Sequence, residues 1–345
     1  MSQVGRGRGN AAMVRGEHVL RPEELVLGAR VVLRHRLPDG SASDALGELV
    51  TVDDTTLVVA TRRGEVSVAR ADLLAGKAVP PPPVRRRAPH TVITTDALEA
   101  VMAEHWRPLE RVDLGDWRLR ASGGFTGRAN SCLTIGSPGC GLDDAIIRVE
   151  RFYQERDLPP MVAVAHPAGG LGEGQEVVDA LAAGGWGVRT PTLVMTAATD
   201  VLPAAHELTL PVGLRVATAA EPDDAWLASY HYQGVDVPPD GRRVLVSADE
   251  QLFVRILDGD RIVAIARGSL SPGWAGVTAL ETVATHRRRG LGRRVLAEIA
   301  DWARTRGATS TYLQVQADNQ GARSLYAAAG FSTHHAYHYR VAPAG

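Results

Sequence analysis

A glycine-bearing turn between two apolar segments constrains this 345-residue chain more than any other feature. Residues 277–284 are rich in β-branched residues and alternate roughly between apolar and polar, as a strand does. From Val295 to Ala303 apolar residues recur at helical spacing, and Gly307 stands where such a helix would end. We therefore expect a strand, a turn at residues 287–293 and a helix. Because the first amides of a helix have no internal partner and the helix dipole adds positive potential, the turn is predicted to hold a pyrophosphate.

Two common phosphate-binding signatures do not fit this turn. It has no lysine followed by serine or threonine, which a nucleotide-kinase P-loop needs. It also has Val295 where a dinucleotide-binding fold needs its third glycine. Gly290 and Gly292 are predicted to leave room for a bulky anion beside the backbone, and the neighbouring arginines add positive charge.

The turn resembles the Arg/Gln-x-x-Gly-x-Gly/Ala signature of the GNAT superfamily of N-acetyltransferases, here Arg287-x-x-Gly290-x-Gly292. In that superfamily the turn holds the pyrophosphate of acetyl-coenzyme A (acetyl-CoA). The resemblance therefore implies acetyl-CoA as the acyl donor. It implies cofactor contacts along the whole turn, at Arg287, Arg288, Arg289, Gly290, Leu291, Gly292 and Arg293.

A second segment resembles the superfamily's Asn-x-x-Ala-x-x-Leu-Tyr-x-x-x-Gly-Phe hallmark, matched from Asn319 to Phe331. The resemblance implies that Tyr326 protonates the departing thiolate of coenzyme A and that Asn319 contacts the pantetheine arm. The residues alone leave a structural alternative open, in which Tyr326 is a core tyrosine and Asn319 is only a helix N-cap. Two hallmarks in the right order and spacing favour the functional interpretation.

The strand before the turn is expected to carry the rest of the site. In relatives its backbone bonds the pantetheine and the acetyl oxygen, and Thr282 and Val283 occupy that place. Glu281 is the best candidate for the general base, provided that burial raises its pKa. Strand alternation could instead turn Glu281 to the other face of the sheet. A water chain could then accept the proton, or one of four histidines: His231, His334, His335 and His338.

The N-terminal part of the chain is predicted to form a separate small domain. Residues 1–20 have no periodicity and are expected to form a disordered tail. Residues 21–77 contain four or five short strand patterns between turn signals, which indicates an SH3-like β-barrel. Residues 78–90, with four consecutive prolines and three arginines in a row, are predicted to form a stiff linker. We expect the barrel to serve docking or oligomerisation, since it has no aromatic platform for nucleic acid.

The rest of the chain is predicted to form two related halves. The segment pattern over residues 91–205 is a shortened form of the GNAT order, without the pyrophosphate signature. Residues 206–345 carry the complete order and are predicted to be the catalytic domain. The fold class is therefore α/β: a mixed sheet flanked by helices, in a degenerate and a complete GNAT copy that follow the barrel. This plan resembles a three-part group of bacterial acetyltransferases, some of them labelled histone acetyltransferases.

One polar stretch inside the first half also resembles that group. Residues 123–131 read Gly-Gly-Phe-Thr-Gly-Arg-Ala-Asn-Ser, and their glycines permit positive φ and close backbone approach. Arg128 and Asn130 are candidate substrate contacts, for example with an acceptor carboxylate. The structural alternative is a tight turn in which Asn130 bonds its own backbone.

Composition narrows the classes of function. A formal net charge of -1 gives no case for nucleic acid or membrane attraction, and no apolar run or leader is present, so a cytoplasmic protein is predicted. Cys132 and Cys140 lack metal-ligand spacing, and no metal is expected. We expect an N-acetyltransferase that passes the acetyl group directly to an amine of a small molecule, peptide or protein, and the sequence is compatible with a homo-oligomer. An acyl-CoA-binding sensor or scaffold without turnover, and a tandem acetyltransferase like mycothiol synthase, remain as alternatives.

Overall fold

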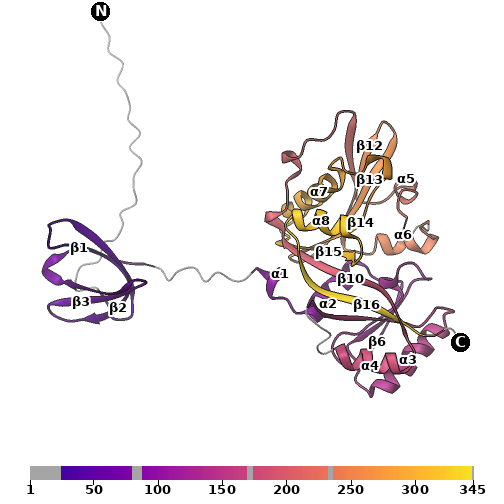
Figure 1. The fold of residues 1–345 in the computed structure, drawn as a ribbon, viewed down its shortest axis with the longest axis horizontal. Coiled ribbons are helices and arrows are strands. Elements are labelled where there is room, and N and C mark those ends of the chain that lie inside the picture. Colours follow the sequence, from indigo (N-terminus) through magenta and orange to yellow (C-terminus); the bar gives the residue numbers. More distant parts are fainter. Residues whose placement is uncertain (1–24, 80–87, 169–173, 232–235, 344–345) are drawn as a thin grey trace, which may run out of the picture. The chain divides into compact units, whose positions relative to one another are not determined.

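The computed structural model describes residues 25–79, 88–168, 174–231 and 236–343 of the chain (Figure 1). It divides the chain into two compact units, residues 1–86 and 87–345. The predicted tail at residues 1–20, and residues 80–87 of the predicted linker, lie outside the described residues.

The first unit contains a five-stranded antiparallel sheet. Its strands are β1 (Arg30–Arg36), β2 (Ala42–Val52), β3 (Thr56–Thr61), β4 (Gly64–Ala69) and β5 (Leu73–Ala78), in the order β4-β3-β2-β1-β5. Alternate apolar residues of these strands, among them Leu33, Leu49 and Leu57, meet in one core. The small strand domain expected from the sequence is confirmed.

The second unit alternates strands and helices. Its first half contains α1 (Pro89–Val92), α2 (Thr95–His105), β6 (Glu110–Leu114), β7 (Trp117–Ala121), β8 (Cys132–Leu133), α3 (Leu142–Gln154), β9 (Met161–Pro167), α4 (Gln175–Ala183) and β10 (Gly187–Ala198). Its second half contains β11 (Leu214–Ala219), α5 (Asp224–Leu227), α6 (Pro239–Leu245), β12 (Glu250–Asp258), β13 (Arg261–Ser271), β14 (Trp274–Thr282), α7 (Leu291–Thr305), β15 (Ser310–Gln316), α8 (Gln320–Ala328) and β16 (Ser332–Val341). The predicted α/β class is confirmed.

The strands of the second unit form one eleven-stranded sheet, in the order β11-β12-β13-β14-β15-β10-β16-β9-β8-β7-β6. β10 belongs to the first half in sequence, yet it lies between β15 and β16 of the second half (Figure 1). β16 in turn lies between β10 and β9. On β10, Thr192 stands opposite Gln316 of β15 and Tyr337 of β16, both in antiparallel register. Each half is therefore completed by a strand of the other, and the sheet continues across the predicted boundary at residue 205.

Helices cover both faces of this sheet. On β12, Val254 packs in the core that contains α7, whereas its neighbour Phe253 packs with α5 and α6. On β15, Leu313 joins the α7 core, whereas Tyr312 packs with α2. Because successive side chains of a strand point to opposite faces, α7 and α8 lie on one face, and α2, α5 and α6 lie on the other. We call these the α7 face and the α2 face.

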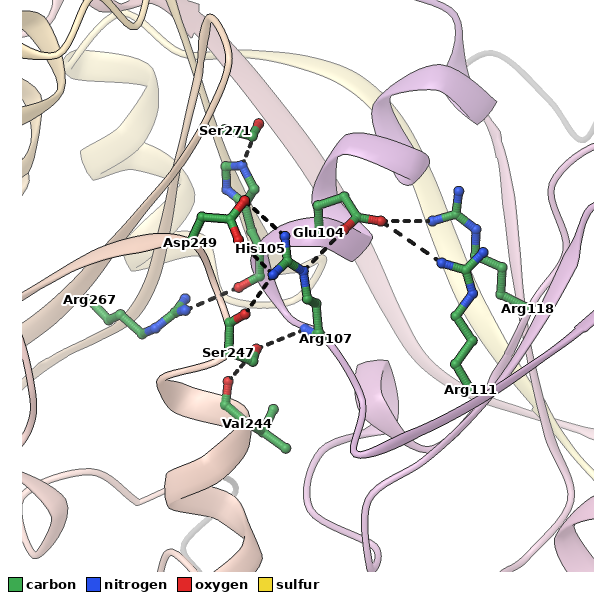
Figure 2. Close-up of polar contacts among 10 residues, drawn as sticks. All are labelled: Glu104, His105, Arg107, Arg111, Arg118, Val244, Ser247, Asp249, Arg267 and Ser271. Atoms are coloured by element: carbon green, nitrogen blue, oxygen red, sulfur yellow. Dashed lines mark hydrogen bonds and ion pairs between the residues drawn. The ribbon is translucent and has the colours of Figure 1, made fainter.

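The end of α2 joins the two halves (Figure 2). Arg107 pairs with Asp249 through two contacts, Nη1 to Oδ1 at 2.7 Å and Nη2 to Oδ2 at 3.0 Å, and its amide donates to Ser247 Oγ at 2.9 Å. Arg267 on β13 is fully buried and donates from Nη2 to the carbonyl oxygen of His105 at 3.1 Å. Burial lowers the pKa of Arg267 to about 10, so the side chain stays charged at neutral pH. These contacts hold the first half of the second unit against its second half.

Candidate active site

Two parallel strands part in the middle of the sheet. β14 and β15 are paired from Trp274 and Ser310 as far as Val277 and Leu313. Within the described residues, no further pair joins them, although both strands continue. The carbonyl of Thr282 accepts from Nε of Arg287 at 3.2 Å, and the carbonyl of Gln316 accepts the amide of Asn319 at 3.1 Å. The other backbone groups of residues 278–282 and 314–316 that face each other are available to a ligand. We call these facing ends the splay.

A β-bulge interrupts the pairing of β14 with β13 next to the splay. The register with β13 shifts between Ile265 and Arg267, and Ala279 on the bulged strand has a φ of 53°. A positive φ at a residue other than glycine is uncommon and stores strain. Such strain is typical of functional sites, and here it lies beside the parted strands.

Only one of the two predicted backbone contacts faces the splay. Val283 donates its amide to Val263 of β13 at 3.0 Å, and its carbonyl accepts the amide of His286 at 2.9 Å. Because adjacent residues of an antiparallel strand alternate the direction of their backbone groups, Thr282 turns its amide away from β13 and toward β15. Thr282 therefore keeps its candidate role, whereas the backbone of Val283 has no free group for a cofactor.

The predicted pyrophosphate turn begins α7. Gly290 is its N-cap with a φ of 81°, and Arg288 before it also has a positive φ of 63°. A cavity of about 190 Å³ borders the turn between residues 207–211 and 289–294. Four of the predicted contacts are exposed arginines, namely Arg287, Arg288, Arg289 and Arg293. Positive charge, unpaired helix amides and a cavity together suit a pyrophosphate.

The two glycines of the turn serve different purposes. A Cβ placed on Gly290 would meet no atom within 4 Å, so this residue is needed for its positive φ. A Cβ on Gly292 would lie 3.1 Å from Cδ2 of Leu325 on α8, so this residue is needed for helix packing. That the two glycines also leave room for a bulky anion stays a prediction. Leu291, also a predicted contact, is buried in the α7 core, so only its backbone faces the cavity.

The second hallmark forms α8 and the residues at its ends. Oδ1 of Asn319 accepts the amide of Ala322 at 3.0 Å, which makes Asn319 the N-cap of α8. Its Nδ2 makes no hydrogen bond to any described residue. Tyr326 packs in the α7 core beside Phe331, with ring centroids 6.1 Å apart.

Tyr326 is buried, yet its hydroxyl has no partner among the described residues and is not enclosed. Burial raises the pKa of Tyr326 to about 12. The phenol is therefore protonated at neutral pH and free to donate a hydrogen bond.

Glu281 lies on the α2 face of the sheet. It lines a cavity of about 450 Å³ together with residues of α5, β13 and β14, and we call this the base cavity. Its Oε1 accepts the amide of His231 at 3.1 Å. Burial raises the pKa of Glu281, and the bond from His231 and the charge of Arg287 oppose that shift only in part. A carboxylate with a raised pKa is suited to accept a proton near neutrality.

The histidines considered as alternative bases are separated by the structure. His231 borders the base cavity beside Glu281. Buried His335 lies 2.9 Å from Glu99 Oε1, and His334 bonds the carbonyl oxygen of Ile93. Burial lowers the pKa of His338 to about 4. The three histidines of β16 do not line the base cavity, so Glu281 and His231 remain the candidate side chains, and the water chain stays an alternative.

Residues 123–131 form a rigid loop, which we call the motif loop. Asn130 is buried, and its Oδ1 accepts the amides of Ser122 at 2.7 Å and Gly124 at 2.9 Å. Its Nδ2 donates to the carbonyls of Phe125 at 2.7 Å and Thr126 at 2.9 Å. These four bonds use the whole capacity of the amide. Asn130 therefore braces the loop, and its predicted role as a substrate contact is corrected in favour of the structural alternative.

Arg128, the other predicted substrate contact, lies on the α2 face. Its guanidinium carbon is 4.4 Å from the centre of the Trp106 ring, within range of a cation–π interaction. It borders a small cavity of about 20 Å³ that also touches Gln314 on β15. Arg128 is therefore close to the end of the splay.

The described residues were also searched for a metal site and a membrane-spanning helix. In residues 25–79, 88–168, 174–231 and 236–343, no group of three or more His, Cys, Asp or Glu side chains could hold a metal ion. No helix within those ranges has the length and apolar character needed to cross a membrane.

Comparison with known proteins gives a family match over most of the chain. Residues 94–340 match the family described as "Probable histone acetyltransferase Rv0428c C-terminal", and residues 25–77 match "Rv0428c N-terminal Sm-like domain". The sheet predicted as an SH3-like barrel corresponds to this Sm-like domain. The chain is 29% identical over 332 residues to "Probable histone acetyltransferase Rv0428c" of Mycobacterium tuberculosis, with 92% of this chain and 95% of the relative covered.

Solved structures with the same fold include proteins that are titled as N-acetyltransferases. A GCN5-related N-acetyltransferase from Kribbella flavida matches with a TM-score of 0.55 at 17% identity, over 74% of this chain and 97% of that one. A tandem GNAT protein from the clavulanic acid biosynthesis pathway matches with a TM-score of 0.52 at 12% identity, over 75% and 90%. At these identities the matches show the fold alone, and they confirm the predicted tandem GNAT architecture.

Proposed function

Because the chain belongs to the Rv0428c-like family of GNAT acetyltransferases, we propose that it transfers the acetyl group of acetyl-CoA directly to an amine within a ternary complex. The observation that carries this proposal is the arrangement of groups around the splay. Tyr326 belongs to the α7 face and Glu281 to the α2 face, and Thr282 follows Glu281 on β14. In the proposed reaction the acid and the base would act from opposite faces of the sheet.

The residues of the α7 face fit the acyl donor. The amides at the start of α7 and the exposed arginines of the turn would hold the pyrophosphate. Thr282 would bond the pantetheine arm or the acetyl oxygen, and Nδ2 of Asn319 is free to contact the arm. Acetyl-CoA supplies an activated acyl group as a thioester.

Each face would supply one of the two groups that transfer protons. An amine attacks a carbonyl carbon only in its neutral form, so Glu281 would accept the proton that the amine loses. The amide of Thr282 would stabilise the negative charge that develops on the acetyl oxygen. Tyr326 would donate its proton to the sulfur as the carbon–sulfur bond breaks, and would regain a proton from solvent. The products are an acetylated amine and free coenzyme A.

The acceptor amine could belong to a protein or to a small molecule. The relative from Mycobacterium tuberculosis is named for histones, which would correspond to a lysine amine presented by a protein. The base cavity, at about 450 Å³, is large enough for a small amine or for a single side chain.

A matched pair of substitutions tests the role of Glu281. Glu281→Gln removes the candidate base, and Asp260→Asn removes an equal charge from another wall of the same cavity. The first should lower kcat by about a hundredfold or more, the contribution typical of a general base, while the KM for acetyl-CoA is unchanged. The second should leave kcat near the wild-type value. Equal effects of the two substitutions would show that the cavity needs negative charge but no base at Glu281.

A further inference from the structure

A further cavity, of about 340 Å³, lies where the two halves of the second unit meet on the α2 face. Its lining comes from the motif loop, the segment before β9, the start of β10, the end of β16 and the residues before α6. Most of the wall is apolar, contributed by Phe125, Leu158, Pro159, Met161, Pro238 and Tyr339. We call it the apolar cavity. Its size is within the range of small-molecule sites.

The motif loop that forms one wall is held in place from behind. Besides the four bonds of Asn130, Nε1 of Trp106 donates to Oγ1 of Thr126 at 3.0 Å. A Cβ on Gly127 would lie 2.7 Å from the ring of Tyr339, so only glycine lets the loop pack this closely on β16. A wall fixed in this way is preformed for a ligand, which lowers the entropy cost of binding.

Backbone strain marks this cavity as well as the splay. In the described part of the chain, five residues other than glycine have positive φ. Ala279 and Arg288 belong to the acyl-donor site, whereas Thr126, with φ 61°, and Thr190, with φ 52°, line the apolar cavity. The fifth, Asp157, directly precedes Leu158 of the cavity wall. Threonine is β-branched and resists this conformation, and strain of this kind clusters at ligand sites.

Two structural connections bring the apolar cavity close to the splay. The carbonyl of Pro191, which follows Thr190, accepts the amide of Ala317 at 2.9 Å, and Ala317 directly follows β15. On the other side, Phe125 packs in the same apolar cluster as the bulge residue Ala279. The cavity therefore lies near the end of β15, and its wall residue Phe125 belongs to the same apolar cluster as Ala279 of β14.

A third connection runs from the rim of the apolar cavity to the proposed base. Asp236 borders the apolar cavity, and its Oδ1 lies 3.8 Å from Nε2 of His231. The amide of His231 donates to Glu281 in the base cavity at 3.1 Å. The two cavities are thus adjacent at His231. A residue at the edge of the apolar cavity therefore lies within 3.8 Å of a residue that borders the base cavity.

We propose that the apolar cavity binds the apolar part of the acetyl acceptor, so that the acceptor is a primary amine bearing an aromatic or branched aliphatic group. This inference rests on the proposed acetyl transfer. A benzene-sized ligand fits a cavity of about 150 Å³, so about 340 Å³ holds one ring with its linker. The degenerate half, through the motif loop and the residues around Leu158, supplies the acceptor specificity of the catalytic half.

Direct binding and turnover can be measured with one pair of amines. The binding probe is 4-fluorophenethylamine, followed by fluorine NMR line broadening with coenzyme A present, and 2-fluoroethylamine is its small counterpart. Turnover is followed as thiol release from acetyl-CoA with 2-phenylethylamine or ethylamine. We expect broadening only for the aromatic probe, and a kcat/KM at least tenfold higher for 2-phenylethylamine, as burial of several carbons gives.

Filling the cavity supplies the matched variants. Leu158→Trp places an indole in the cavity from a half-exposed wall residue, and Pro159→Trp does so from an exposed wall residue. With two variants, the test still works if one of them fails to fold. Ile147→Trp adds the same ring on the exposed surface of α3, away from the cavity wall. Each cavity variant should raise the KM for 2-phenylethylamine at least tenfold and leave the KM values for ethylamine and acetyl-CoA unchanged. Ile147→Trp should behave as the wild type.

The outcomes separate this inference from the proposed function. Thiol release with equal kcat/KM for both amines, unaffected by Leu158→Trp and Pro159→Trp, would overturn the acceptor pocket and leave the transferase intact. Absence of broadening with wild-type protein would also overturn the pocket. Broadening that the cavity variants abolish, without thiol release from any amine, would support the apolar site and refute acetyl transfer.

Discussion

Asn130→Ala is the substitution whose cost the structure defines most fully. The buried amide bonds the amides of Ser122 and Gly124 and the carbonyls of Phe125 and Thr126. Alanine removes all four bonds and leaves those backbone groups without their partner. At about 1 kcal/mol for each bond, the expected loss in the free energy of unfolding is about 4 kcal/mol. For a unit of this size, that corresponds to a fall in Tm of about 8 to 16 °C.

Asn319→Ala is the matched control for this experiment. Asn319 is exposed, and its side chain makes a single capping bond to the amide of Ala322 at 3.0 Å. Its loss should cost about 1 kcal/mol, the usual value for an N-cap. Urea denaturation of both variants in the full-length protein gives the comparison. The reasoning is refuted if Asn130→Ala costs no more than Asn319→Ala, since the amide would then be free for a ligand instead of bracing the loop.

Three further predictions concern residues of the second half. Tyr326→Phe removes a hydroxyl without a partner among the described residues, so stability should not fall while kcat drops by about a hundredfold; an unchanged kcat excludes Tyr326 as the acid. Burial raises the folded-state pKa of Glu281, so its contribution to stability is complete below the unfolded pKa and is lost as the pH rises through the folded pKa. Glu281→Gln should therefore have a higher Tm than the wild type at pH 7.5 but not at pH 4, and a wild type that is more stable at both pH values would contradict this. Gly290→Ala should cost about 1 kcal/mol because φ is 81°, and Gly290→Asn should cost less because asparagine tolerates that conformation; the reverse order in thermal melts would show that space, not φ, requires the glycine.

The sequence predicted the fold well wherever a local pattern determines the structure. The helical spacing after residue 295 and the caps of α8 lie within single elements, so they were readable from the chain. The positions of β10 and β16 in the sheet, each beside strands of the other half, could not be predicted from the sequence. An alternating pattern determines which face of a strand is buried but not which strand lies beside it. Both strands carry apolar residues that would suit either neighbour.

The candidate site divides in the same way. Gly290 and Tyr326 stand at signature positions, and the structure puts them at the start of α7 and in the α7 core. The bulge at Ala279 carries no signal in the sequence, since alanine rarely adopts positive φ. The apolar cavity could not be predicted from the sequence either, because its lining comes from five segments that are far apart in the chain. For Asn130, the polar environment suggested a ligand, but the polar partners are the backbone of its own loop.

The measurement that tests the central claim most directly is a two-substrate analysis of acetyl transfer. Thiol release is recorded while acetyl-CoA is varied at several fixed concentrations of the most active amine or lysine-bearing peptide from a panel, and the acetylated product is identified by mass spectrometry. Direct transfer predicts double-reciprocal lines that intersect, with one acetylated amine formed for each coenzyme A released. Parallel lines with an acetylated enzyme intermediate, or coenzyme A binding without acceptor-dependent release, would contradict it.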